Sequence, residues 1–268
     1  MAVETTTFSN NSADTWFRDI MFDCVLCPRA CHVNRLAGQT GYCGQTAELM
    51  AARASLHYWE EPCISGTSGS GTVFFSGCNL RCVFCQNHNI ALGKAGRVIA
   101  PEHLAEIFLQ LQEQGANNIN LVTPTHFLPQ IVIALEQAKQ QGLHLPIVYN
   151  TGSYESPEAL RHLEGLVDIY LPDLKYFSPE LSTAYSHAPD YFETACAAIS
   201  EMYRQVGDSV IDEDTGLMQH GMIVRHLLLP GQTKDSKKIL RYLHETYGDH
   251  IYISIMNQYT PCLLYTSP

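Results

Sequence analysis

Three cysteines on one short loop are the residues of this sequence best suited to chemistry. Cys78, Cys82 and Cys85 follow the pattern C-x3-C-x2-C directly after a predicted buried β-strand. Iron–sulfur cubanes are held by thiolates, normally four of them. Three thiolates can bind three corners of a cubane and leave the fourth iron open to a substrate or cofactor, as in a catalytic metal site. The alternative is a zinc knuckle completed by His88, but zinc sites usually combine two separate C-x2-C pairs, which this loop lacks.

A second group of cysteines precedes this loop and has the composition of a metal site of its own. Its members follow the pattern C-x2-C-x3-C-x11-C and are Cys24, Cys27, Cys31 and Cys43. Four thiolates complete either a structural zinc site or a second iron–sulfur cluster, and the spacing does not distinguish the two. Cys63 lies near enough in the sequence to replace one ligand. Reduced, buried cysteines are the structural alternative, which such dense clustering disfavours. Cys196 and Cys262 are isolated and receive no role.

The composition of the chain argues against several classes of protein. The chain has 268 residues, 16 Lys and Arg against 27 Asp and Glu, and a net charge of −11, which argues against binding to nucleic acid or to an anionic membrane. No apolar run approaches the ~18–20 residues of a membrane helix, and the first residues lack the basic and apolar regions of a signal peptide. Cysteines clustered in a chain with ample core material indicate metal ligation in a reducing compartment rather than a disulfide scaffold. We therefore expect a cytoplasmic protein.

The elements that position these cysteines alternate between strand and helix patterns. Short apolar runs rich in β-formers occupy residues 72–75, 119–122, 147–149, 167–171, 222–229 and 251–256. Segments of helical period separate them, around 104–111, 128–135, from Pro157, and at 191–205 and 236–247. This alternation is typical of βα units. We predict an α/β fold, a partial (β/α)6 TIM-like barrel with parallel strands, with an open doubly wound sheet as the alternative, plus a small N-terminal cysteine-rich metal-binding lobe. We predict that the chain consists of a flexible arm at residues 1–15, this lobe at residues 16–65 and the main domain at residues 66–261.

Polar residues follow the predicted strands. They include Thr123, Thr125 and His126 after the second run, Asn150, Thr151 and Ser153 after the third, and Asp173 and Lys175 after the fourth. In parallel α/β folds the carboxyl ends of the strands meet at one edge, where active sites form. These segments are therefore expected to meet in one pocket, although polar βα loops are common and the pattern alone is weak.

The cysteine loop, with Phe84 before its last cysteine, resembles that of the radical S-adenosylmethionine (SAM) superfamily. The wider sequence is similar to the pyruvate formate-lyase activating enzymes, and within them to an uncharacterised branch. This similarity runs over residues 24–261 through the segments CVLCPRAC, EEPCISG, FFSGCNLRCVFCQN, NLVTPTHF, VDIYLPDLKY, RHLLLPG and MNQYTP. Residues 262–268 do not resemble the family's continuation, so we expect a truncated or foreign tail.

The resemblance implies a reaction and its cofactors. A [4Fe-4S] cluster on Cys78, Cys82 and Cys85 would bind SAM at its open iron. Reductive cleavage of SAM would give a 5′-deoxyadenosyl radical, which abstracts hydrogen from a protein or peptide, as glycyl-radical-enzyme activases do. The electron would come from a reductant such as flavodoxin or ferredoxin. The alternatives are a radical SAM enzyme acting on a small molecule or on a peptide that is not a glycyl-radical enzyme, and a non-catalytic metal-binding module.

Candidate SAM contacts come from the strand ends and the cysteine loop: Phe84, Thr123, Thr125, Asn150, Asp173, Lys175 and Arg225. The resemblance implies this role for Asp173 and Lys175, which belong to a DLK segment, and a surface salt bridge is the alternative. The Gly-Gly-Glu-type segment of many relatives is replaced here by Thr-Pro-Thr-His, whose hydroxyls and carbonyls can still accept hydrogen bonds. His126 is either a contact to SAM or substrate or a helix cap. Arg225 interrupts an apolar strand and needs an anionic partner, either a ligand carboxylate or one of the protein's own.

Overall fold

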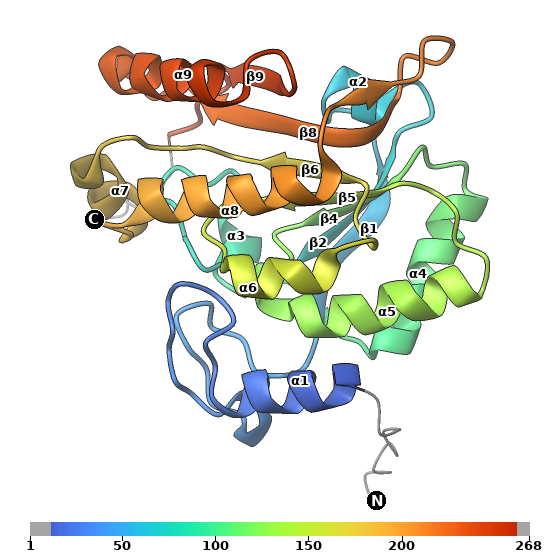
Figure 1. The fold of residues 1–268 in the computed structure, drawn as a ribbon. Helices are drawn as coiled ribbons and strands as arrows, with labels where there is room; N and C mark the ends of the chain where they lie inside the picture. Colours follow the sequence, from blue (N-terminus) through green and yellow to red (C-terminus); the bar gives the residue numbers. More distant parts are fainter. Residues whose placement is uncertain (1–11, 262–268) are drawn as a thin grey trace, which may run out of the picture.

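The computed structural model describes residues 12–261, and a nine-stranded sheet forms the centre of this part of the chain (Figure 1). The expected tail at 262–268, with Cys262, lies outside the described residues, as do residues 1–11 of the expected arm. Helix α1 (Ser12–Phe22) begins inside that expected flexible arm, so residues 12–15 are helical. No helix in the described range is long and apolar enough to cross a membrane.

Six parallel strands follow one another across the sheet in chain order. They are β2 (Ser70–Phe75), β4 (Ile119–Val122), β5 (Ile147–Thr151), β6 (Ile169–Pro172), β8 (Met218–Leu227) and β9 (Tyr252–Met256). Each pairs in parallel with the next. The predicted parallel α/β sheet is thus confirmed. The doubly wound alternative is wrong, because that arrangement requires a reversal of strand order that this sheet lacks.

Helices connect these strands and cover the sheet. They are α4 (Pro101–Glu113), α5 (Leu128–Gln140), α6 (Pro157–Leu160), α7 (Pro179–Ser186), α8 (Tyr191–Val206) and α9 (Thr233–Tyr247). In Figure 1, α4, α5, α6 and α8 lie along one side of the sheet, and α9 lies beside β9 and β8. Proline at the first helical position is compatible with helix geometry because its missing N–H would have no partner there. Ser156 and Ser178 cap α6 and α7 by accepting from backbone N–H groups, as the Ser-Pro pattern at 156–157 predicts.

The sheet extends beyond the parallel strands at both ends. β1 (Met50–His57) pairs antiparallel with β2 and with β3 (Arg97–Val98), and β7 (Val210–Ile211) pairs antiparallel with β8. The sequence places residues 50–57 in the cysteine-rich lobe, whereas the structure places them in the sheet. The run MAARASLH lacks the apolar alternation by which a half-buried strand is recognised, and none of its residues is fully buried.

Short helical turns lie between the main elements. They are η1 (Arg35–Ala37), α2 (Pro62–Ser65), α3 (His88–Ala91), η2 (Thr125–Phe127) and η3 (Arg161–Leu163). The remaining N-terminal residues, 23–49, form loops that share the main hydrophobic core through Cys24, Leu26 and Leu49. Helix α1 packs against α5, which attaches this lobe to the helical side of the sheet (Figure 1).

We predict that Phe108→Ala destabilises the protein by about 3–5 kcal/mol, because it leaves a cavity in the core. Phe108 is fully buried between α4 and the sheet. The matched control is Phe22→Ala, whose side chain is 64% exposed and whose loss we expect to cost less than about 0.5 kcal/mol. Denaturant unfolding of both variants checks this, and equal losses would contradict the assignment of α4 to the core.

Candidate functional site

A pocket of about 610 Å³ opens where the parallel strands end. The cysteine loop after β2 contributes Cys82, Phe84 and Cys85 to its lining. The strand ends contribute Asn150 from β5, Asp173 and Lys175 after β6, and Arg225 from β8, and the loop after β1 contributes Glu60. This is the convergence that parallel topology predicts, because the carboxyl ends of such strands share one edge.

N–H and O–H donors lie beside two of the three sulfur atoms of the cysteine loop. The backbone N–H groups of Leu80 and Arg81 lie 3.3 and 3.5 Å from Cys78 Sγ, and the Ser186 hydroxyl lies 3.0 Å from Cys82 Sγ. Burial, together with the neighbouring thiols, raises the pKa of Cys85 to about 12 and raises that of Cys78. Buried thiols so close together resist ionisation unless a cation neutralises them. Donors to sulfur combined with this burial fit thiolates that ligate a metal centre.

Within residues 12–261, no three Cys, His, Asp or Glu side chains stand close enough together to hold one metal ion. This holds for both cysteine groups, so it does not distinguish an iron–sulfur cluster on this loop from the zinc knuckle considered from the sequence.

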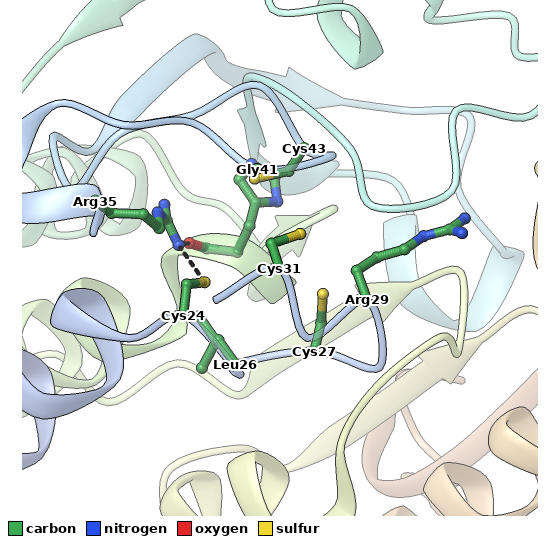
Figure 2. Close-up of a pocket in the computed structure, with 9 residues that line it drawn as sticks. Cys24, Leu26, Cys27, Arg29, Cys31, Arg35, Gly41 and Cys43 are labelled. Atoms are coloured by element: carbon green, nitrogen blue, oxygen red, sulfur yellow. Dashed lines mark hydrogen bonds between the residues drawn. The ribbon is translucent and has the colours of Figure 1, made fainter. Parts of the chain in front are cut away.

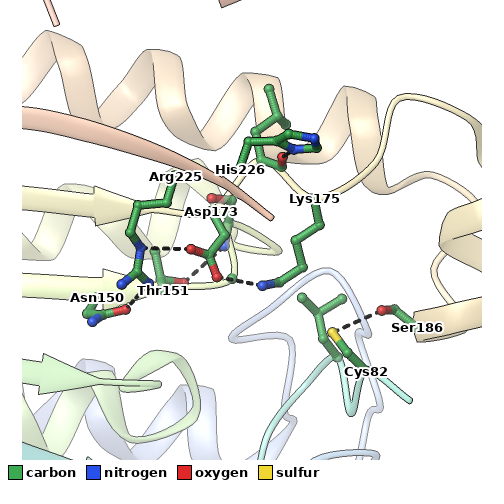
Figure 3. Close-up of polar contacts among 12 residues, drawn as sticks. Cys82, Asn150, Thr151, Asp173, Lys175, Ser186, Arg225 and His226 are labelled. Atoms are coloured by element: carbon green, nitrogen blue, oxygen red, sulfur yellow. Dashed lines mark hydrogen bonds and ion pairs between the residues drawn. The ribbon is translucent and has the colours of Figure 1, made fainter. Parts of the chain in front are cut away.

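A buried network of charges crosses the pocket (Figure 3). The Arg225 guanidinium donates to Asp173 Oδ1 at 2.9 Å, to Glu60 Oε1 at 2.8 Å and to Asn150 Oδ1 at 2.6 Å. Lys175 Nζ pairs with the other oxygen of Asp173. Burial alone would raise the pKa of Asp173, but Arg225 and Lys175 outweigh it and lower this pKa. Burial would lower the pKa of Lys175 and that of Arg225, but the Asp173 carboxylate outweighs it and raises both, so these three groups are ionised near neutral pH.

The network gives these residues ionic partners within the protein. Arg225 has carboxylate partners within the protein, Asp173 and Glu60, as one sequence-based alternative required. Asp173 and Lys175 are paired, but they are largely buried in the pocket wall rather than forming a surface salt bridge. Glu60 was not singled out from the sequence, although it lies in the EEPCISG segment. Its contact with Arg225 spans 165 positions, and no local pattern encodes such a contact.

Thr123 and Thr125 do not line this pocket. The Thr125 hydroxyl instead donates to Glu155 Oε1 at 2.6 Å, and Thr123 has a left-handed backbone with φ of +57°. His126 neither reaches the pocket nor caps a helix by its side chain, since its Nε2 donates to the Ser76 carbonyl. Burial lowers the pKa of His126 to about 3, so its ring is neutral. Ser153 is fully buried, and its hydroxyl has no hydrogen-bond partner.

Glu155 forms a second buried polar centre that the sequence did not reveal. Its Oε1 accepts from the hydroxyls of Thr125, Thr151 and Tyr149, while its Oε2 has no partner. Burial raises the pKa of this carboxyl to about 7, although the three hydroxyls oppose the shift. Between pH 4.5 and 7 the folded state thus keeps a proton that the unfolded state releases.

The first cysteine group also comes together in space. Cys24, Cys27, Cys31 and Cys43 line one small cavity in the N-terminal lobe (Figure 2). Cys63, considered as a substitute ligand, lies in α2 and does not line this cavity. The nine described cysteines all carry free thiols.

We predict that Glu155→Gln changes the pH dependence of stability. As pH rises from 4.5 through 7, the wild-type folded state loses about 3 kcal/mol from this group, because the buried carboxyl must ionise. The variant has no such loss, so its stability relative to wild type should rise by that amount between pH 5 and 8. Urea unfolding across this range measures it, with exposed Glu245→Gln as control. A difference that does not vary with pH would show that Glu155 does not titrate there.

Comparison with known proteins identifies the family. The family model of the radical SAM superfamily matches residues 72–243. An uncharacterised protein of Methanocaldococcus jannaschii is 28% identical over 254 residues, covering 91% of this chain and 68% of the relative. The pyruvate formate-lyase-activating enzyme of Clostridium pasteurianum is 29% identical over 121 residues, which span 42% of this chain and 48% of that enzyme. The crystal structure of methylornithine synthase aligns with a TM-score of 0.47 and 17% identity, over 69% of this chain and 52% of that one. The chain belongs to the radical SAM superfamily of enzymes.

Proposed function

We propose that this protein cleaves SAM reductively at a [4Fe-4S] cluster held by Cys78, Cys82 and Cys85, and that it abstracts hydrogen from a protein or peptide. The observation that carries the proposal is that the cysteine loop and the Arg225 network line one pocket at the carboxyl ends of the parallel strands. The sequential strand order further supports the superfamily's partial (β/α)6 barrel. When bound, cluster and SAM together supply a 5′-deoxyadenosyl radical.

The side chains of the pocket suit the functional groups of SAM. Lys175 and Arg225 offer cationic donors for a carboxylate, and Asp173 and Glu60 offer acceptors for an ammonium group or ribose hydroxyls. Phe84 lies in the pocket wall among the rings of Tyr176, Tyr185 and Tyr259. The volume of about 610 Å³ lies within the range of small-molecule sites.

One buried group beside the network lacks a donor. Asn120 is fully buried in β4 and donates to Glu60 Oε2, but its own Oδ1 has no partner. A buried acceptor without a donor is costly, so an ordered water is expected there. Asn150 donates to the same Glu60 oxygen, so both amides orient this carboxylate toward Arg225.

The choice of a protein or peptide substrate rests on two observations. One of the relatives is a pyruvate formate-lyase-activating enzyme, whose name describes action on another enzyme. Trp59 lines the pocket and is 90% exposed, and large exposed aromatic side chains are enriched at protein interfaces. The competing proposal is a small-molecule substrate, which the pocket's volume favours, since it lies within the usual range for such ligands. Radical SAM enzymes require a reductant, and we propose flavodoxin or ferredoxin for this role.

We predict that Cys82→Ala abolishes the formation of 5′-deoxyadenosine, because two thiolates on this loop cannot hold the cluster. The assay is anaerobic reconstitution with iron and sulfide, reduction with dithionite, and chromatography of the products after addition of SAM. Cys63→Ala is the matched control and should retain wild-type turnover. Full turnover by Cys82→Ala would refute the cluster assignment.

We predict that Lys175→Met raises the dissociation constant for SAM about 10- to 100-fold, because one charge-assisted hydrogen bond contributes about 1.5–3 kcal/mol. Equilibrium binding to the reconstituted protein measures this effect, and the cluster's visible spectrum should stay unchanged. Lys237→Met, on the exposed face of α9, is the control. Unchanged affinity, or loss of the spectrum, would show that Lys175 does not contact SAM.

A further inference from the structure

A second thiol cluster lies in the N-terminal lobe and shares no lining residue with the SAM pocket (Figure 2). Its four cysteines surround a cavity of about 10 Å³. This volume is roughly that of one water molecule. The cavity therefore suits a single small occupant and is too small for a cubane.

The backbone bends sharply to bring the thiols together. Ala30 and His32, on either side of Cys31, both have left-handed backbones, with φ of +38° and +52°. Strain of this kind in residues other than glycine is characteristic of functional sites. A Cβ atom at Gly41 would lie 2.7 Å from Cys31 Sγ, so only glycine allows this close approach.

Two of the four thiols have an N–H donor beside them. Tyr42 donates its backbone N–H to Cys31 Sγ at 3.3 Å, and the Arg35 guanidinium lies 4.0 Å from Cys24 Sγ. N–H donors to sulfur support thiolate ligands in metal sites.

The charge of Arg35 gives an independent argument for an anionic centre. Its side chain is 1% exposed and donates to the carbonyls of Thr46 and His126. Among residues 12–261 no carboxylate pairs with it, although a buried cation without an anion is strongly destabilising. Four thiolates around one divalent cation carry a net charge of −2 and would supply the missing anion beside Arg35.

We propose that Cys24, Cys27, Cys31 and Cys43 bind one divalent metal ion of the zinc class. Binding converts four thiols to thiolates and releases four protons to solvent, so charge and atoms balance. No three potential ligands in the described part of the chain stand at metal-binding distance, so binding of one ion requires the four sulfur atoms to move closer together. Four sulfur ligands leave no open position, so the site is structural rather than catalytic.

The site acts on the cysteine loop through Arg29, which lies between two of its ligands in sequence. Arg29 Nε donates to the Asn79 carbonyl at 2.8 Å, inside the loop that carries Cys78 and Cys82. Its Nη2 donates to the Ser186 carbonyl at 2.8 Å, and the Ser186 hydroxyl donates to Cys82 Sγ. Arg29 is thus a positioning residue for this loop. This part of the inference rests on the proposed function.

Metal analysis of the full-length protein tests the site. Protein purified without oxygen and saturated with zinc should retain about one zinc per chain after desalting. Cys27→Ser and Cys24→Ser should each lose most of it, while Cys63→Ser retains it. Cobalt in place of zinc should give the charge-transfer and ligand-field bands of tetrahedral thiolate coordination in wild type, a readout that does not depend on the folding of any variant.

Two zinc measurements would overturn the site: no zinc in the wild-type protein, or an unchanged zinc content in both Cys27→Ser and Cys24→Ser. An iron measurement would also overturn it. If Cys27→Ser lost four irons with their sulfides while Cys82→Ala kept a cluster, the first cysteine group would hold a cluster and not a single ion. Cys82→Ala should keep its zinc whether or not the proposed function is correct, which separates the two proposals. Arg29→Ala should also keep its zinc but incorporate several-fold less iron at the Cys78–Cys85 loop. Equal iron incorporation would remove the positioning role and leave the metal site standing.

Discussion

The buried Arg225 guanidinium is the interaction on which the pocket depends. A cation placed in the middle of a sheet requires anions, and Asp173 and Glu60 supply them from β6 and from the loop after β1. Lys175 brings the sum of the four charges to zero. Because the four charges sum to zero, the set has no net preference for a cation or an anion. It does offer neighbouring positive and negative groups to a ligand that carries both a positive and a negative charge. The amino-acid end of SAM is such a molecule.

Strand β5 explains why neighbouring polar residues have different roles. Side chains alternate between the two faces of a strand. Asn150 therefore points to the pocket and bonds Arg225, while Tyr149 and Thr151 point to the other face and bond Glu155. The same carboxyl receives the Thr125 hydroxyl, which accounts for the absence of this threonine from the pocket. The strand ends are held by one network on each face.

The sequence predicts the parts of the fold that local patterns encode. The strand expected at residues 119–122 has those bounds in the structure, because all four residues are apolar or buried between parallel neighbours. Strand β1 was not predicted because its apolar pattern is weak. The position of the following loop, which carries Glu60, was therefore not predicted either. Asn150, Asp173 and Lys175 were expected in one pocket from their strand-end positions, and they line it, whereas Thr123 and Thr125, expected there on the same ground, do not. Glu60 required the tertiary structure, since its partners lie on β4, β5 and β8. Glu155 required it because its complete burial and its contact with Thr125 depend on packing between separate segments.

The cysteine loop lies between two cationic side chains, one on the side of the pocket and one on the side of the lobe. On the side of the pocket, Lys175 lies close enough to favour the thiolates of Cys78 and Cys85. On the side of the lobe, the Arg29 guanidinium lies over the ring of Tyr42 at 3.9 Å and bonds the carbonyl of Asn79. A loop that must hold thiolates in a low-dielectric interior needs positive charge nearby. Because these two cations come from segments about 150 residues apart, the loop reaches its final form only when lobe and sheet have both folded.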